Sequence, residues 1–153
     1  MTGMSRTIHL ADEAATRALA STLAERAKPG DVIALSGTLG TGKSVFARAF
    51  IHARGCREEV PSPTFTLVQI YDLPDGAIHH FDLYRLAAPD EAWELDIEDA
   101  FAEGISLIEW PENLGSLLPP AHLALRLEMG EAESARKAIL AGHGDWRDRL
   151  EGL

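Results

Sequence analysis

The feature that most constrains the fold is the segment at residues 37–44, whose spacing is G-x-x-x-x-G-K-[ST]. Glycines at this spacing let backbone N–H groups approach phosphate oxygens, and a helix beginning directly afterwards adds the partial positive charge of its N-terminus. A continuous apolar run at 32–35 precedes the segment, and an amphipathic pattern follows it over 43–53. The order of buried strand, glycine-rich loop and helix predicts an α/β fold with a phosphate-binding loop.

The residue types in this loop predict which part of a bound nucleotide each residue contacts. Gly40 and Gly42 are the positions at which the backbone approaches the ligand closely. We expect Lys43 to reach the β- and γ-phosphates of a nucleotide, and the Ser44 hydroxyl to bind Mg²⁺. A glycine-rich turn without a ligand is the alternative, and the strand and helix on either side argue against it.

A metal site of this kind needs a carboxylate from the end of a neighbouring strand. Glu109 ends the apolar run at 105–108 and is the first candidate. Asp82 lies in a second strand-like segment, where it either contacts the metal shell or positions the attacking water. The alternative for Asp82 is a structural one, in which its carboxylate caps a turn or pairs with Arg85.

Two further features leave alternatives open, and a third does not. Thr64 lies in a proline-flanked loop, which is either a switch that closes around a γ-phosphate or a stiff connector. Trp110 is a core aromatic, a wall of the nucleotide pocket or a surface for a partner. His79 and His80 are adjacent on a strand and face opposite sides, so they cannot bind one ion and we interpret them as structural.

The rest of the chain predicts strands and helices around the loop. Turn residues at 74–76 separate two β-rich segments, which indicates an antiparallel hairpin. The acidic segment 89–101 predicts one or two short helices. Further strands are expected at 7–10, 77–84, 105–110, 122–128 and 135–141, with helices at 11–28 and 145–150. We therefore expect one P-loop ATPase domain over 1–153, a three-layer P-loop NTPase-like α/β fold with a mixed central sheet flanked by helices.

Composition narrows the classes of partner. The formal net charge of −10 argues against direct binding of nucleic acid, because that binding depends on Lys and Arg neutralising phosphates. The single cysteine, Cys56, cannot form an internal disulfide and indicates a reducing compartment. No signal-peptide pattern and no run of about 18 apolar residues is present, so we expect a cytoplasmic protein without a membrane partner.

Four segments in a fixed order resemble the TsaE (YjeE) family over about residues 8–127. They read LSGTLGTGKS at 35–44, SPTFTLV at 62–68, HFDLYRL at 80–86 and IEWPE at 108–112. The tail beyond residue 130 matches only loosely. Four ordered motifs are far more specific than the glycine-rich loop alone.

The resemblance implies an ATPase subunit of the bacterial machinery that installs threonylcarbamoyl on the adenosine 3′ of the anticodon, in tRNAs reading codons that begin with A. Its implied partner is the TsaB–TsaD heterodimer, in which TsaD transfers the threonylcarbamoyl group. ATP hydrolysis is implied to reset this heterodimer. Contact with tRNA is then only indirect. The resemblance assigns Mg²⁺ to Ser44 and Glu109, a switch to Thr64 and hydrolysis to Asp82, with Lys43 also catalytic. The residues expected to bind ATP are Gly37, Gly40, Thr41, Gly42, Lys43, Ser44 and Val45.

Several competing functions share the loop. A small-molecule or nucleotide kinase needs a basic lid, and Arg54, Arg57 and Arg85 are too few and too scattered to form one. A GTPase needs an Asn-Lys-x-Asp segment, which the sequence lacks, so adenine is favoured. A module that binds ATP only as a structural ligand is disfavoured by the two carboxylates. No residue is identified as an arginine finger, which predicts slow hydrolysis without a partner.

Overall fold

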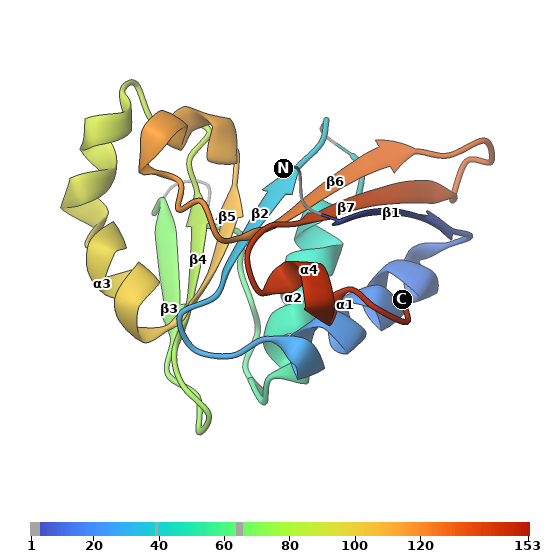
Figure 1. Ribbon diagram of the computed structural model, residues 1–153, viewed down its shortest axis with the longest axis horizontal. Helices are drawn as coiled ribbons and strands as arrows, with labels where there is room; N and C mark the ends of the chain where they lie inside the picture. The colour runs from blue at the N-terminus through green and yellow to red at the C-terminus, as the bar shows by residue number, and fades with distance from the viewer. Residues whose placement is uncertain (1–3, 39, 64–65) are drawn as a thin grey trace.

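A seven-stranded sheet forms the centre of the computed structural model, which describes residues 4–38, 40–63 and 66–153. The strands lie in the order β1-β7-β6-β2-β5-β4-β3 (Figure 1). Their bounds are β1 Met4–Leu10, β2 Val32–Ser36, β3 Val68–Tyr71, β4 Ile78–Asp82, β5 Ile105–Glu109, β6 Leu123–Met129 and β7 Arg136–Gly142. The helices are α1 Glu13–Arg26, α2 Lys43–Ala53, α3 Ile97–Glu103 and α4 Trp146–Arg149, with 3-10 helices η1 Pro89–Leu95 and η2 Pro111–Leu117.

Parallel pairing aligns the strands on which the predicted site depends. β2 pairs in parallel with both β5 and β6, and β4 pairs in parallel with β5. The pairs β3–β4, β6–β7 and β1–β7 are antiparallel. The prediction of a mixed sheet with an antiparallel hairpin is confirmed. Because β2, β4 and β5 run in the same direction, their carboxyl ends meet at one edge of the sheet.

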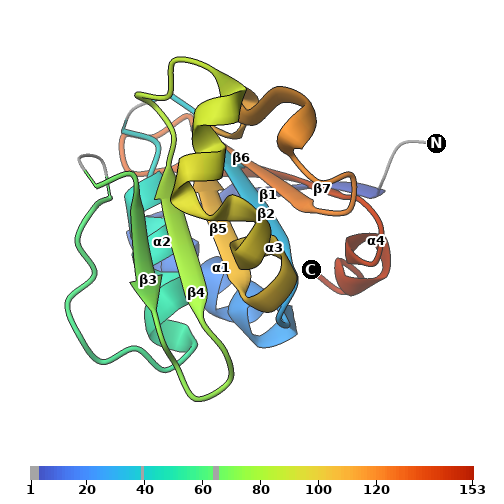
Figure 2. The ribbon, with the colours of Figure 1, turned by 90° about the vertical axis from the view of Figure 1, so that its left-hand side faces the viewer.

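Helices cover both faces of this sheet, as Figure 2 shows with α3 in front of the sheet and α1 and α2 behind it. One hydrophobic core joins α1 and α2 to the sheet and includes Leu23, Phe46 and Phe50. A second core lies under η1, η2 and α3 and includes Phe81 and Ile108. Successive strand residues point to opposite faces, and the central strands β2, β4 and β5 contribute side chains to both cores. In the described ranges, no helix is long and apolar enough to cross a bilayer.

Several predicted elements differ in extent from those observed. The predicted helix over 11–28 is observed as α1, whose N-cap Asp12 accepts a hydrogen bond from the Ala15 N–H at 2.9 Å. The predicted strand over 105–110 ends one residue early, because Trp110 adopts a left-handed conformation with φ of 59°. The 3-10 helix η2 was not predicted.

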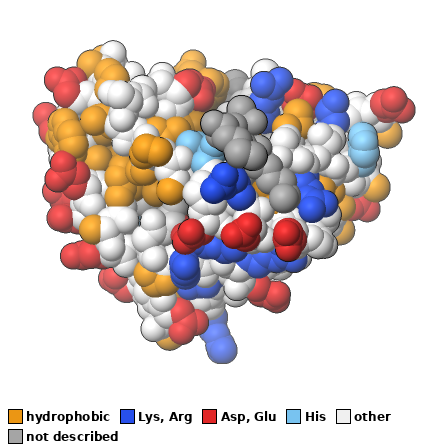
Figure 3. Space-filling view, viewed as in Figure 1, with side chains coloured by type: hydrophobic (Ala, Val, Ile, Leu, Met, Phe, Trp, Pro, Cys, Tyr) orange, Lys and Arg blue, Asp and Glu red, His pale blue; other side chains and the backbone are white. Residues whose placement is uncertain are grey.

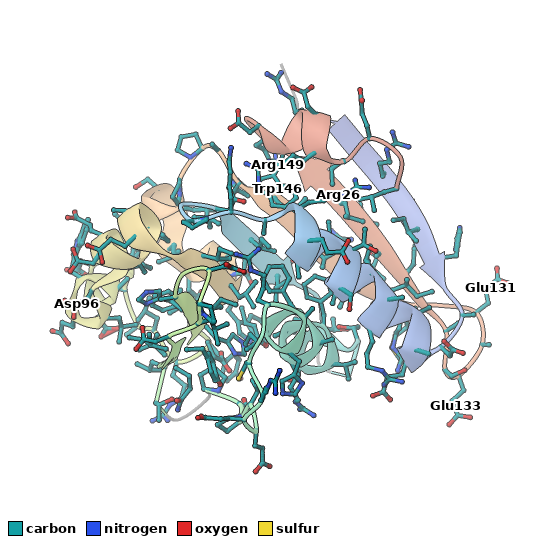
Figure 4. The ribbon with its side chains drawn as sticks, turned by 90° about the horizontal axis from the view of Figure 1, so that it is seen from below. Arg26, Asp96, Glu131, Glu133, Trp146 and Arg149 are labelled. Atoms are coloured by element: carbon teal, nitrogen blue, oxygen red, sulfur yellow. The ribbon has the colours of Figure 1, made fainter. Side chains whose placement is uncertain are left out.

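The C-terminal helix is fastened to the start of the central strand. The Arg149 guanidinium donates to both carboxylate oxygens of Asp31, with Nη2 3.0 Å from Oδ1. Arg149 also lies over the Trp146 ring, 4.5 Å from its centroid, and Arg26 donates to the Arg149 carbonyl at 2.6 Å. Figure 4 shows Arg26, Trp146 and Arg149 gathered beside α4. The helix expected at 145–150 is therefore observed as α4 and is part of the packed structure.

Candidate functional site

The glycine-rich loop runs from the end of β2 to the start of α2. Gly42 is the N-cap of α2, with φ of 100°, and as a glycine it has no side chain to accept a hydrogen bond from the first turn. The N-terminus of α2 thus presents backbone donors of the kind that bind anions. A side chain at Gly37 would run into the Leu127 carbonyl oxygen, so only glycine fits where the loop passes β6.

The loop is held in shape by its own side chains and by one arginine. Thr41 is fully buried, and its hydroxyl donates to the Thr38 carbonyl at 2.7 Å. Arg136, at the start of β7, donates from Nη2 to the Gly40 carbonyl at 3.2 Å. These two contacts hold the loop backbone around Gly40 in place. In both, the acceptor is a backbone carbonyl oxygen rather than a carboxylate.

Lys43 is 6% exposed and lies beneath an aromatic side chain. Its Nζ is 4.2 Å from the centroid of the Trp110 ring, a cation–π contact. Trp110 packs in turn on Tyr84, with ring centroids 4.9 Å apart. Trp110 also packs against the second hydrophobic core, so it is partly a core aromatic and partly a wall over Lys43.

A cavity of about 330 Å³ brings most of the predicted site residues together. It is open to solvent and lies at the carboxyl edge of β2, β4 and β5. Its lining comes from the loop, the first turn of α2, the segment between α2 and β3, and the ends of β4 and β5: Gly40, Gly42, Lys43, Ser44, Val45, Ser62, Asp82, Glu109 and Trp110. The predicted Thr64 lies outside the described residues. Gly37 lines a neighbouring cavity instead, on the other side of Trp110.

Strand register places the two predicted carboxylates side by side. Asp82 and Glu109 are direct partners in the parallel ladder of β4 and β5, and both are buried, at 6% and 5% exposure. Asp82 Oδ1 accepts from the Tyr84 backbone N–H at 3.1 Å. The turn-capping role considered for Asp82 is therefore present, and the same residue also lines the cavity.

His80 is a residue that the sequence reasoning left out of the site. It is 3% exposed, and its Nε2 lies 2.7 Å from Glu109 Oε2. The prediction that His79 and His80 face opposite sides agrees with their contacts, since His79 stacks on Phe81. The missed signal was the spacing of two between His80 and Asp82, because residues two apart on a strand share a face.

A second cavity, of about 240 Å³, lies on the other side of the loop and shares part of its lining with the first. It is bounded by the start of α1, by the loop and by the start of β7. Its lining consists of Glu13, Thr16, Gly40, Thr41, Gly42, Val45, Ser134 and Arg136. The loop therefore lies between two cavities: the first is lined by Lys43, Asp82 and Glu109, and the second by Glu13, Arg136 and small or polar residues.

The donor atoms at the first cavity fit a hard divalent cation. The Ser44 hydroxyl and the Glu109 carboxylate line it together, and Mg²⁺ prefers such oxygen ligands. Among the described residues no three His, Cys, Asp or Glu side chains are grouped to hold a metal. Mg²⁺ commonly uses only one or two carboxylates and takes its other ligands from phosphates and water, so the residues present fit this ion.

Comparison with known proteins gives one consistent family. The family model described as "Threonylcarbamoyl adenosine biosynthesis protein TsaE" matches residues 10–138. The tRNA threonylcarbamoyladenosine biosynthesis protein TsaE of Rickettsia felis is 42% identical over 121 residues, which cover 78% of this chain and 71% of the relative. The protein of the same name from Bacillus subtilis is 38% identical over 113 residues, covering 72% of this chain and 69% of the relative.

The fold also matches a solved structure. The crystal structure of YdiB from Bacillus subtilis superimposes with a TM-score of 0.80 at 26% identity, covering 98% of this chain and 93% of that one. The similarity therefore includes the C-terminal region beyond residue 138, where the family model ends.

Proposed function

The chain belongs to the TsaE family of tRNA threonylcarbamoyladenosine biosynthesis proteins, and we propose that it is the ATP-binding and ATP-hydrolysing subunit of that system. The observation that carries the proposal is the single cavity lined by Lys43, Ser44, Asp82 and Glu109. A lysine, a hydroxyl and two acids beside a helix N-terminus are the groups that P-loop ATPases use. The fold is accordingly proposed to be that of a P-loop NTPase.

The two cavities suggest how ATP lies on the loop. The triphosphate would follow the loop N–H groups from Gly40 to Val45 into the first cavity. The base would occupy the second cavity, near Thr16 and Arg136, which adjoins the same loop. Backbone donors and the α2 N-terminus would hold the phosphate charge without needing a basic surface.

The residues of the first cavity divide the chemistry of hydrolysis among them. Lys43 would leave the Trp110 ring and pair with phosphate oxygens, stabilising charge that grows on the β–γ bridge. Ser44 and Glu109 would hold Mg²⁺, which supplies further neutralisation of that charge when bound. Asp82 would orient the attacking water or accept its proton, because its carboxylate lines the same cavity. Thr64 remains a proposed switch residue.

We propose that the TsaB–TsaD heterodimer is the protein partner and that hydrolysis resets it between turnovers. The net charge of −10 is consistent with tRNA being held mainly by other subunits, and acidic side chains lie among the basic ones on the face shown in Figure 3. No residue was identified from the sequence as an arginine finger, a group that can raise the rate of hydrolysis by a factor of ~10³–10⁵. The isolated protein would therefore be a slow ATPase that depends on its partner.

The test is ATP hydrolysis with Mg²⁺, by the protein alone and with purified TsaB–TsaD. Weak activity that rises with the heterodimer and is lost in Lys43→Ala and Glu109→Ala would support the proposal. Lys28→Ala is the matched control, since this lysine is largely exposed and its side chain pairs with the exposed Asp145 at 3.7 Å. Fast turnover by the pure protein, or no effect of the heterodimer, would contradict it.

A kinase is the second candidate, because a neighbouring cavity offers room for a phosphate acceptor. This cavity of about 500 Å³ lies beyond Trp110 and is lined also by Gly37, Thr38 and Arg126. A screen of small-molecule acceptors separates the two functions. Transfer of the γ-phosphate to an acceptor, without stimulation by TsaB–TsaD, would favour the kinase.

A further inference from the structure

One buried side chain contacts the site without lining it. His80 lies on β4 two residues before Asp82, so both side chains point to the same face of the sheet. The cavity lining includes Asp82 and Glu109 but not His80, among the described residues. His80 instead reaches Glu109 from within the protein, with Nε2 2.7 Å from Oε2.

The hydrogen bond sets the roles of the two groups when Glu109 binds a metal. A carboxylate that binds Mg²⁺ only accepts hydrogen bonds, so in that state Nε2 of His80 is the donor. The other ring nitrogen, Nδ1, is buried and has no hydrogen-bond partner in the described part of the structure. The one polar contact that the ring makes there is therefore with Glu109.

The geometry points to His80 as a positioning residue that holds the Glu109 carboxylate in place for Mg²⁺. This inference rests on the proposed function, which assigns Mg²⁺ to Ser44 and Glu109. A glutamate side chain has several rotatable bonds, and holding it in one rotamer before binding removes an entropic cost from metal binding. Partners of metal-binding carboxylates act in this way, and their loss typically costs 10–100-fold in metal affinity or activity.

A purely structural role for His80 makes a different prediction from a positioning role. If His80 only fills space and stabilises the fold, its replacement lowers the thermal stability but leaves the effect of Mg²⁺ on nucleotide binding unchanged. If it positions Glu109, the effect of Mg²⁺ falls even in variants that remain folded. The two ring nitrogens allow matched variants that separate these outcomes.

Glutamine and asparagine each mimic one ring nitrogen. His80→Gln places its amide nitrogen near the position of Nε2, so it can still donate to Glu109. His80→Asn places its amide near Nδ1, which has no partner, and loses the bond to Glu109. His80→Phe keeps the ring shape and has no donor, so it serves if the asparagine variant does not fold.

The measurement is the Kd for a slowly hydrolysed ATP analogue, adenosine 5′-(β,γ-imido)triphosphate, by calorimetry with Mg²⁺ and with EDTA. The Kd with EDTA divided by the Kd with Mg²⁺ gives a ratio that reports the coupling between metal and nucleotide. We expect His80→Asn and His80→Phe to lower this ratio by roughly 10-fold, and His80→Gln to change it by less than about 3-fold. Circular dichroism identifies the variants that keep the fold.

A double-variant cycle shows whether His80 acts through Glu109. In a Glu109→Ala background, His80→Asn should cause no further loss in the Mg²⁺ ratio, because the residue it positions is gone. An unchanged ratio in folded His80→Asn or His80→Phe, or a further loss in the Glu109→Ala background, would overturn the inference. A wild-type protein that fails to bind the analogue, or binds it without any effect of Mg²⁺, would overturn the proposed function as well.

Discussion

Two buried acidic residues at opposite ends of the parallel strands differ in the hydrogen bonds that hold them. Asp31 precedes β2 and is 8% exposed, and Glu109 ends β5 and is 5% exposed. Asp31 accepts from the guanidinium of Arg149 at both oxygens and from the Lys28 backbone N–H at 2.7 Å. Among the residues that the structure describes, Glu109 contacts one hydrogen-bonding side chain, His80, at one oxygen, and it faces a cavity.

The comparison teaches that burial alone does not separate a structural acid from a functional one. Two other properties make the distinction: how many hydrogen bonds the carboxylate oxygens accept within the fold, and whether the carboxylate faces a cavity. A carboxylate can accept about four hydrogen bonds, and Asp31 uses much of that capacity within the fold. Glu109 keeps capacity for a ligand at the edge where the parallel strands end.

The largest effect is expected from replacing Glu109, the acid that faces the cavity. Glu109→Gln removes the charge but keeps the shape and still accepts a hydrogen bond from His80. We expect ATP hydrolysis with TsaB–TsaD to fall by a factor of about 100 or more, because a charged group is lost from the proposed reacting centre. The Tm, measured by circular dichroism, should stay close to that of the wild type. Retained hydrolysis would exclude Glu109 from the site.

The next effect breaks the comparison at the other acid. Arg149→Ala leaves the Asp31 carboxylate buried without its main partner, so the free energy of unfolding should fall by about 2–4 kcal/mol. A Tm lower by roughly 5–12 °C is expected for a chain of this size. Below the new Tm, nucleotide affinity should match the wild type. The control is Arg147→Ala, because the Arg147 side chain is exposed and donates a long hydrogen bond to the Gly144 carbonyl, at 3.4 Å.

A double substitution checks the physical reason for that loss. Asp31→Asn combined with Arg149→Met removes both charges and leaves no buried carboxylate unpaired. Replacing a buried ion pair by uncharged groups is usually less costly than breaking it. The combined variant should therefore have a higher Tm than Arg149→Ala. An equal or lower Tm would show that packing of the Arg149 side chain, rather than the charge pair, holds α4.

A third arginine sharpens the comparison, since it bonds carbonyl oxygens rather than an acid. Arg136 donates to Gly40 in the loop and to Glu133 and Ala135 in its own hairpin. Arg136→Ala should weaken ATP binding by about 1 kcal/mol, roughly five-fold, through loss of loop support. The change in the free energy of unfolding should be smaller than for Arg149→Ala. An unchanged Kd by calorimetry would separate Arg136 from the nucleotide site.

The smallest expected effect concerns pH at the edge where Asp31 lies. His122 and His143 stack there with centroids 4.6 Å apart, and burial, followed by the neighbouring His143, lowers the pKa of His122. The unfolded chain then binds protons more readily, so stability is retained above about pH 6.5 and falls as pH decreases below it. We expect a Tm decrease of roughly 1–3 °C between pH 7.5 and 5.5 from this source.

His122→Asn provides the control for the pH effect. Its amide can still donate to the Pro119 carbonyl, which His122 Nδ1 contacts at 2.8 Å, but it does not titrate. The dependence of Tm on pH should become shallower without vanishing, because burial also lowers the pKa of His79. An identical dependence in the variant would exclude His122 as its source.

The sequence predicts the region around the loop because the signals there are local. Residues 32–53 contain an apolar run, glycines at required spacings and an amphipathic repeat, and all three predict structure within a few residues of themselves. Strand β2, the loop and helix α2 were accordingly found where expected. The neighbouring carboxylates were identified individually, and only the strand register shows that Asp82 and Glu109 are paired.

The sequence does not predict contacts that depend on the folded sheet. Asp31 and Arg149 are 118 positions apart, and no local pattern relates them. His80 and Glu109 come together because β4 and β5 are neighbours, an adjacency that spacing alone does not reveal. The helix η2 is missed for another reason: it has only seven residues and a non-helical Gly115, so it shows no periodicity.

The pairing of β1 with β7 imposes an order on folding during synthesis. β1 is made early, yet its whole length pairs with β7, from Leu10 opposite Arg136 to Met4 opposite Gly142. At a translation rate of about 5–20 residues per second, the first strand waits on the order of 10 s for its partner. The half of the sheet that carries the loop and Glu109 can assemble before that, so the edge opposite β3 would be the last to close on the ribosome.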